Sequence, residues 1–148
     1  MMLPDAYATP QARARIALIA SSFARLLGRP LATGGDCAEA LWAASDAIVA
    51  HGTQADPVFF FGNRAALAAF ECPVDQFIAM PSRLSAEAPL RAERQALLDR
   101  VHTHGFIEDY AGVRISAQGR RFRIAGAVVW NLIDEQGRHH GQAATFAV

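Results

Sequence analysis

The last third of the sequence constrains the fold most, because it holds three strand-like segments separated by short polar turns. Over residues 122–132 apolar residues occupy every second position, and Gly126 is the one exception in the series. Such alternation is typical of a strand with one buried face. The turns at residues 117–120 and 134–137 each place a glycine where a hairpin needs a positive φ. The pattern predicts an antiparallel meander whose apolar face is covered by the rest of the chain.

Length and composition favour one soluble globular domain. The chain has 148 residues, of which 52% are hydrophobic and 19% are charged, and this length permits a sizeable core. It contains no run of about 18 apolar residues that would span a bilayer. Fourteen basic residues balance fourteen acidic ones, so no net field draws the chain to nucleic acid or anionic lipid. We therefore expect neither nucleic acid nor a membrane as a partner.

The N-terminus and the cysteines bear on the cellular compartment. The chain start lacks the basic residues and the apolar run of a signal peptide. Cys37 and Cys72 have no metal-ligand spacing. We expect a cytoplasmic location, free thiols and no metal site.

Residues 10–28 read as a helix with an apolar stripe, which Gly28 and Pro30 end. The stripe consists of Ile16, Ile19, Phe23, Leu26 and Leu27. A glycine-containing joint follows, so we divide the chain into an N-terminal helical extension, residues 1–34, and a main domain, residues 35–148. An exposed apolar stripe marks an interface, which predicts a homodimer formed through this helix; the alternative is a helix folded back on its own sheet.

The middle of the chain alternates short helical and strand-like segments. Residues 37–45 favour a helix, and residues 47–50 either end that helix or form a first strand. The aromatic run at residues 57–61 fits a buried strand, after which Asn63 caps a short helix. A longer helix is expected from near Pro89 to about His104.

The predicted element order is that of a PAS domain: two strands, several short helices, one longer helix and three meandering strands. Seven segments in order resemble, more specifically, the MEKHLA domain family; they are residues 56–70, 80–86, 93–94, 109–116, 119–122, 129–132 and 141–146. The resemblance covers residues 41–146. The family is PAS-like and occurs as small bacterial proteins and at the C-terminal end of plant homeodomain leucine-zipper transcription factors. This sequence shows neither a zipper, nor a homeodomain, nor the six-letter motif that names the family, so we do not carry over a transcription-factor function.

The resemblance implies an α+β fold, a PAS-like antiparallel sheet with helices on one face, preceded by the N-terminal helical extension. It also implies a sensory or binding role, with a small molecule held between the sheet and the helices. The residues expected to line that pocket are Phe61, Asn63, Phe77, Met80, Arg83, Leu97, Val101, Ile115, Phe122, Val128, Trp130 and Gln142.

Flavin and haem, the cofactors of some PAS relatives, each require particular residues in the pocket. A flavin photosensor needs a reactive cysteine in an Asn-Cys-Arg context, and the nearest segment, residues 81–83, has no thiol. Gln142 lies where flavin-binding relatives use a glutamine, although a strand glutamine also pairs with backbone. Haem needs an axial ligand; His102, His104 and Cys72 are the candidates, but histidines in a last helical turn also complement the helix dipole. We predict no cofactor, with flavin or haem as the alternatives.

Catalytic motifs are absent from the sequence. Asp109 is expected to pair with Arg83 or Arg114, and anion binding by Arg83 is the alternative. The sequence therefore predicts a sensory or protein-interaction module that binds a small apolar or aromatic ligand without catalysis. Two alternatives stay open: a small cone-shaped α+β hydrolase or isomerase with Asp109 or His102 as general base, and a dimerisation unit with a filled core.

Overall fold

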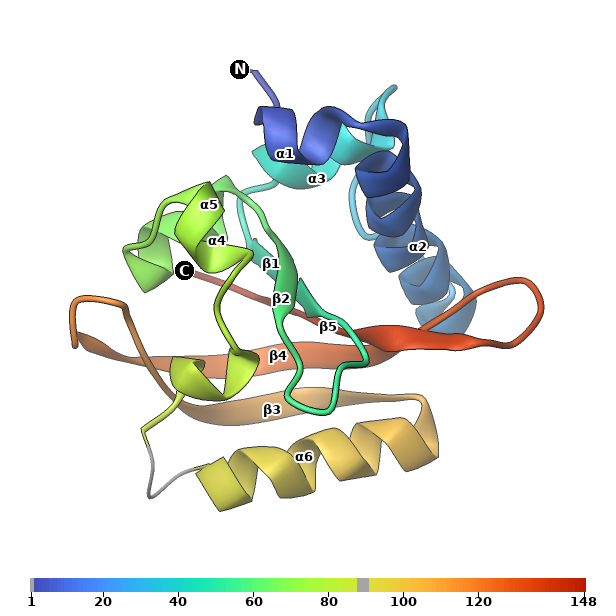
Figure 1. Ribbon diagram of the computed structural model, residues 1–148. Coiled ribbons are helices and arrows are strands. Elements are labelled where there is room, and N and C mark those ends of the chain that lie inside the picture. The colour runs from blue at the N-terminus through green and yellow to red at the C-terminus, as the bar shows by residue number, and fades with distance from the viewer. Residues whose placement is uncertain (1, 88–90) are drawn as a thin grey trace.

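The strands form one five-stranded antiparallel sheet in the order β2-β1-β5-β4-β3 (Figure 1). The computed structural model describes residues 2–87 and 91–148. The strands are β1 (Ala47–His51), β2 (Phe59–Gly62), β3 (Phe106–Ile115), β4 (Arg121–Ile133) and β5 (His139–Phe146). The predicted meander is confirmed as β3, β4 and β5, and residues 47–50, left open between helix and strand, belong to β1.

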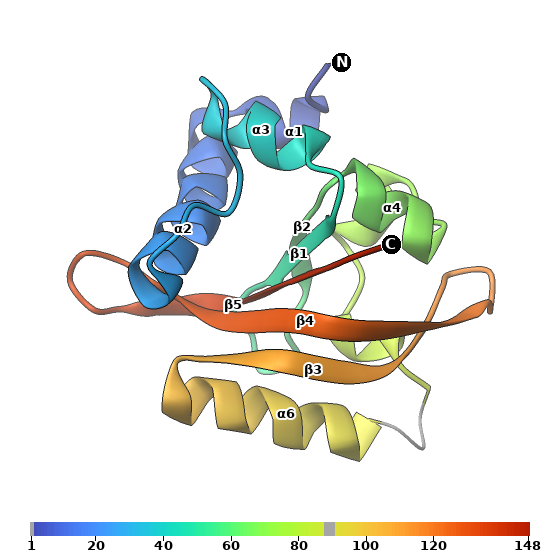
Figure 2. The ribbon, with the colours of Figure 1, turned by 180° about the vertical axis from the view of Figure 1, so that it is seen from behind.

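Helices cover both faces of this sheet (Figure 2). The N-terminal helices are α1 (Asp5–Ala8), α2 (Pro10–Leu27) and α3 (Cys37–Ala43); the others are α4 (Arg64–Phe70), α5 (Val74–Phe77), the 3-10 helix η1 (Ser82–Ser85) and α6 (Arg91–His104). The expected start of α6 near Pro89 lies outside the described residues. No helix in the described part of the chain combines the length and apolarity needed to cross a membrane.

Two hydrophobic clusters define the two faces. On the N-terminal face, Ile48, Trp130 and Leu132 pack with residues of α1, α2 and α3. On the opposite face, here called the cavity face, Val49 and Phe59 pack with residues of α4 and α5, and Val129 packs with α6. Since successive strand residues point to opposite faces, each central strand contributes to both cores.

The prediction that β4 has a single buried face is wrong, because a bulge reverses the faces to which its alternate residues point. Pairs Gly112–Ile124 and Tyr110–Ala127 enclose one extra residue on β4, where Gly126 has φ 63°. Ile124 therefore lies in the cavity-face cluster, whereas Trp130, at the same parity, lies in the N-terminal cluster. A compensating extra residue on β3 coincides with Asp109, also at φ 63°.

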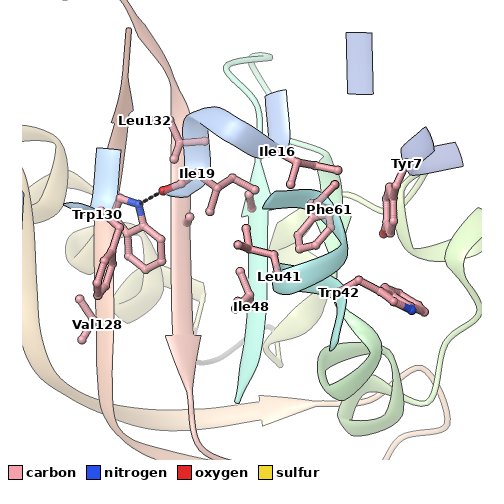
Figure 3. Packing of buried hydrophobic residues seen from close by; sticks show 14 residues of the cluster. Tyr7, Ile16, Ile19, Leu41, Trp42, Ile48, Phe61, Val128, Trp130 and Leu132 are labelled. Atoms are coloured by element: carbon pink, nitrogen blue, oxygen red, sulfur yellow. Dashed lines mark hydrogen bonds between the residues drawn. The ribbon is translucent and has the colours of Figure 1, made fainter. Parts of the chain in front are cut away.

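The apolar stripe of α2 is covered by the protein's own sheet (Figure 3). Ile16, Ile19 and Phe23 are buried. Phe23 meets the Trp130 ring edge-on at a centroid distance of 4.9 Å, and Trp130 Nε1 donates a hydrogen bond to Ile19 O at 3.2 Å. The alternative arrangement, a helix folded on its own sheet, is the one that the structure has, while the homodimer stays a prediction.

Asn63 links three elements at the start of α4, and its predicted role as a helix cap is confirmed. Its Oδ1 accepts hydrogen bonds from Ala66 N at 3.0 Å and from Ile48 N at 2.9 Å. Its Nδ2 donates to Leu41 O at 3.0 Å and to Asp46 O at 2.8 Å. The side chain is fully buried; three of the four hydrogen bonds are buried, and the one to Asp46 O is partly buried.

Candidate functional site

A cavity of about 50 Å³ lies between the cavity face of the sheet and α6. Most of its wall consists of aliphatic and aromatic side chains, and the polar groups come from β1, β3, β5, α6 and η1. The lining residues are Val49, His51, Phe59, Phe70, Ser85, Arg94, Leu97, Leu98, Tyr110, Arg114, Ile124, Val129, Gln142, Ala143, Ala144 and Phe146. The site is therefore an apolar chamber with a few polar groups directed into it, as is typical of small-molecule sites.

Arg94, near the start of α6, brings a buried positive charge to the cavity. Its side chain is 8% exposed, and its Nη2 donates a hydrogen bond to Ser82 Oγ at 2.8 Å. No carboxylate in the described residues forms an ion pair with it. Burial, together with the nearby Arg114, lowers the pKa of Arg94 to about 10, so the guanidinium stays charged at neutral pH.

Arg114 and Tyr110 of β3 add two more polar side chains to the cavity lining. Arg114 Nη2 donates to the Tyr110 hydroxyl at 3.1 Å, and Arg114 Nη1 donates to Val113 O at 3.1 Å. Because the Tyr110 oxygen accepts this bond, its own hydrogen remains free to donate. The two arginines and the tyrosine thus give the cavity a donor-rich side.

His51, at the end of β1, adds a buried acceptor. Its Nδ1 lies 3.0 Å from Gly52 O, and since a carbonyl only accepts, the hydrogen of the neutral ring belongs on Nδ1. Its Nε2 is buried without a hydrogen-bond partner among the described residues. Burial lowers the pKa of His51 to about 4, so at neutral pH Nε2 keeps a lone pair that no donor among the described residues occupies.

Gln142 connects the sheet to α6 at the edge of the cavity. Its Nε2 donates to Leu98 O at 2.9 Å and to Asn131 Oδ1 at 3.1 Å. Asn131 in turn donates from Nδ2 to Val101 O at 3.0 Å. Two strand amides therefore bind carbonyl groups of α6 and hold this helix against the sheet.

The residues predicted for the pocket are distributed over several parts of the molecule. Leu97 and Gln142 line the cavity. Phe61, Val128 and Trp130 belong to the cluster on the N-terminal face, on the other side of the sheet from the cavity.

Other predicted pocket residues lie near the cavity but outside its lining. The rings of Phe77 and Phe122 contact Phe70, with centroid distances of 5.8 and 5.1 Å, and Met80 packs on the same cluster. Val101, on the buried side of α6, packs against Val129 of β4.

Ile115, Asn63 and Arg83 are the remaining predicted residues. Ile115 is half-buried at the end of β3, and Asn63 is the buried helix cap described above. Arg83 is exposed and pairs with Asp56 at 3.1 Å. The expected pairing of Asp109 with Arg83 or Arg114 is not found, because these arginines bond to Asp56 and Tyr110.

The haem and general-base candidates lie outside the cavity lining, whereas Gln142, the flavin candidate, is part of it. Neither Asp109 nor His102, the alternative general bases, is among the lining residues, nor are His104 and Cys72. Cys37 is exposed on α3. No group of three or more His, Cys, Asp and Glu residues within the described ranges is placed to hold a metal ion.

Sequence reasoning missed His51, Arg94, Tyr110 and Arg114 as cavity residues. An arginine on an otherwise polar helix reads as a solvated charge, and a histidine after a short apolar run has no special spacing. The available signal was the motif segments: residues 93–94 and 109–116 both lie in the resemblance to the family, and they carry three of these four residues.

An antiparallel sheet of this order, with helices enclosing a cavity on one face, defines a PAS domain. The PAS domain of a protein from Colwellia psychrerythraea has a TM-score of 0.59 to this chain at 18% identity, covering 74% of this chain and 90% of that one. The photo-excited blue-light photoreceptor Vivid has a TM-score of 0.59 at 13% identity, covering 86% and 92%. At these identities the likeness concerns the fold alone.

Sequence comparison identifies the family within this class. The sequence profile of the MEKHLA domain matches residues 13–148, and the chain therefore belongs to the MEKHLA domain family. It is 29% identical over 157 residues to the homeobox-leucine zipper protein ATHB-9 of Arabidopsis thaliana, an alignment that covers 98% of this chain and 18% of that protein. The chain thus spans less than a fifth of the length of this curated relative.

Proposed function

We propose that this PAS-like MEKHLA domain is a sensory module that binds a small, largely apolar ligand in the cavity beneath α6 and does not catalyse a reaction. The observation that carries the proposal is the chamber itself: its walls are mostly apolar, yet its lining includes His51, whose buried Nε2 has no hydrogen-bond partner among the described residues. A buried polar atom without a partner costs free energy, and a ligand that brings a donor to this nitrogen, either its own or that of a bridging water, removes that cost.

Helix α6 is the element that would report whether the cavity is occupied. Arg94, Leu97 and Leu98 of this helix line the cavity, and Gln142 bonds the Leu98 carbonyl to the sheet. A ligand that contacts these side chains shifts the position of α6 or its dynamics. The outer side of the same helix is exposed, for example at Gln95 and Asp99, and is accessible to a protein partner.

Flavin and haem are not the ligands that we propose. Sites for molecules of drug size have volumes of roughly 300–1,000 Å³, whereas this cavity has about 50 Å³. Its lining contains no cysteine, which a flavin-thiol adduct requires. Protein purified from cells supplied with both cofactors should show no flavin or Soret absorbance, and stoichiometric absorbance in either region would contradict this part of the proposal.

Filling the cavity tests the proposal directly. Ala144 lines the cavity, and Ala144→Leu inserts three heavy atoms there; Ala68→Leu makes the same change on the exposed side of α4. A fragment library of small molecules is screened by ligand-observed NMR, with native mass spectrometry for co-purified compounds. We expect compounds that bind the wild-type protein and Ala68→Leu but not Ala144→Leu. Absence of wild-type binders, or equal binding to both variants, overturns the proposal.

The homodimer formed through α2 is a separate proposal. It is expected from the apolar stripe of this helix, and most of that stripe is buried against the protein's own sheet. Light scattering of the full chain over a range of concentrations decides it: a concentration-independent monomer would exclude it.

A further inference from the structure

We propose that the cavity is a carboxylate-binding site, anchored by Arg94 and Arg114, whose ligand is a short-chain monocarboxylic acid. The inference rests on the proposed function, since it names the chemical class of the ligand in the same cavity.

The first argument is a buried charge without a counterion. Arg94 is more than nine-tenths buried, and its partner in the described residues is the neutral hydroxyl of Ser82. Asp56, which shares a surface cleft with Arg94, is engaged by Arg83 at 3.1 Å. An unpaired buried cation is destabilising, so an anion that enters the cavity gains the interaction that the protein itself does not supply.

The second argument is the arrangement of donors. Arg94 comes from α6, and Arg114 and Tyr110 come from β3, so residues of two elements contribute N–H and O–H donors to the lining of the chamber. A carboxylate has two oxygens with about four lone-pair sites. Guanidinium groups match this planar geometry through paired hydrogen bonds. A neutral apolar ligand leaves the buried charge of Arg94, whose acceptor among the described residues is the neutral Ser82 hydroxyl, without a counterion.

The third argument is size and the nature of the opposite wall. A cavity of roughly 150 Å³ accommodates benzene, and this one has about a third of that volume, 50 Å³. Beyond the polar groups the walls are formed by side chains such as Phe59, Ile124 and Val129. An acid with a short alkyl chain satisfies both the donors and the apolar wall, whereas phosphate or sulfate would place charged oxygens against the aromatic rings.

The cavity also lies close to a route from solvent. His51, Arg94, Leu98 and Gln142 line both the cavity and a surface cleft that includes residues 52, 53 and 55–57. These four side chains form the wall between the two spaces, so rotation of one of them opens a path.

Propionate is the probe, and propionamide is its neutral counterpart of nearly the same shape. Binding of each to the full chain is measured by ligand-observed NMR and by thermal shift in a carboxylate-free buffer, with sodium phosphate as a third ligand. We expect propionate to bind at least tenfold more tightly than either propionamide or phosphate. Equal or tighter binding of propionamide or phosphate overturns the carboxylate proposal.

Variants assign the binding to the arginine. Arg94→Met removes the charge with little change in length, and Arg100→Met makes the same change at an exposed position of α6. We expect propionate affinity to fall at least tenfold in Arg94→Met and to stay unchanged in Arg100→Met. Unliganded Arg94→Met should melt no lower than the wild type, since an unpaired buried charge has been removed. Unchanged affinity in Arg94→Met contradicts the proposal.

The two proposals fail in different ways. If neutral compounds bind in the cavity and carboxylates do not, the sensory proposal stands and the carboxylate assignment is overturned. If Ala144→Leu changes the binding of no compound, both are overturned. Should Arg94→Met not fold, the comparison of propionate with propionamide on the wild-type protein still decides the assignment.

Discussion

Replacement of Trp130 with alanine tests how strongly the N-terminal helices depend on the sheet. Trp130 is fully buried, packs edge-on against Phe23 of α2 at 4.9 Å, and donates a hydrogen bond to Ile19 O. Truncation of a buried tryptophan costs about 3–5 kcal/mol. Trp130→Phe keeps a ring beside Phe23 but loses the N–H donor. We expect the free energy of unfolding to fall by about 1 kcal/mol for the lost hydrogen bond, and further because the phenylalanine ring buries less area.

Urea unfolding followed by far-UV circular dichroism measures these losses, because fluorescence would change with the tryptophan itself. We expect the free energy of unfolding to decrease in the order wild type, Trp130→Phe, Trp130→Ala. Limited proteolysis should also begin within α2 in Trp130→Ala, since this helix loses its main contact. A Trp130→Ala protein within about 1 kcal/mol of the wild type, with α2 still protected, would refute the reasoning that the ring joins α2 to the sheet.

Three further changes test particular positions. Asn63→Ala removes four hydrogen bonds, three of them buried, and should lower the free energy of unfolding by about 3 kcal/mol or more, measured by urea titration. Asp109→Gly should raise the melting temperature, because glycine adopts the positive φ of this position without strain. Gly126→Ala should lower it at a cost of about 1–2 kcal/mol; open space surrounds Gly126, so this cost arises from its positive φ and not from a clash. Opposite signs would contradict the bulge assignments. Burial lowers the pKa of His51 to about 4 from an ordinary value of 6.5, so between these pH values the unfolded chain binds a proton at His51 that the folded protein does not. The contribution of His51 to the free energy of unfolding is therefore complete above pH 6.5 and falls by up to about 3 kcal/mol toward pH 4. His51→Gln should flatten this pH dependence.

Much of the local structure follows from short-range patterns in the sequence. The α2 stripe has helical spacing, Asn63 stands directly before an alanine-rich segment, and glycines mark the turns of the meander. Each of these signals acts within a few residues, so one sequence is sufficient to interpret it. The order of the motifs extended this local picture to a PAS-like fold.

The composition of the cavity was decided by tertiary structure. The bulge at Gly126 on β4 carries Trp130 to the N-terminal face and Val129 to the cavity face. A period of two assigns faces only while the register is unbroken, and one extra residue reverses every later position. Arg94 acquires its role in the same way: its burial depends on α6 packing against β3 and β4, a contact between segments whose alignment no local pattern encodes.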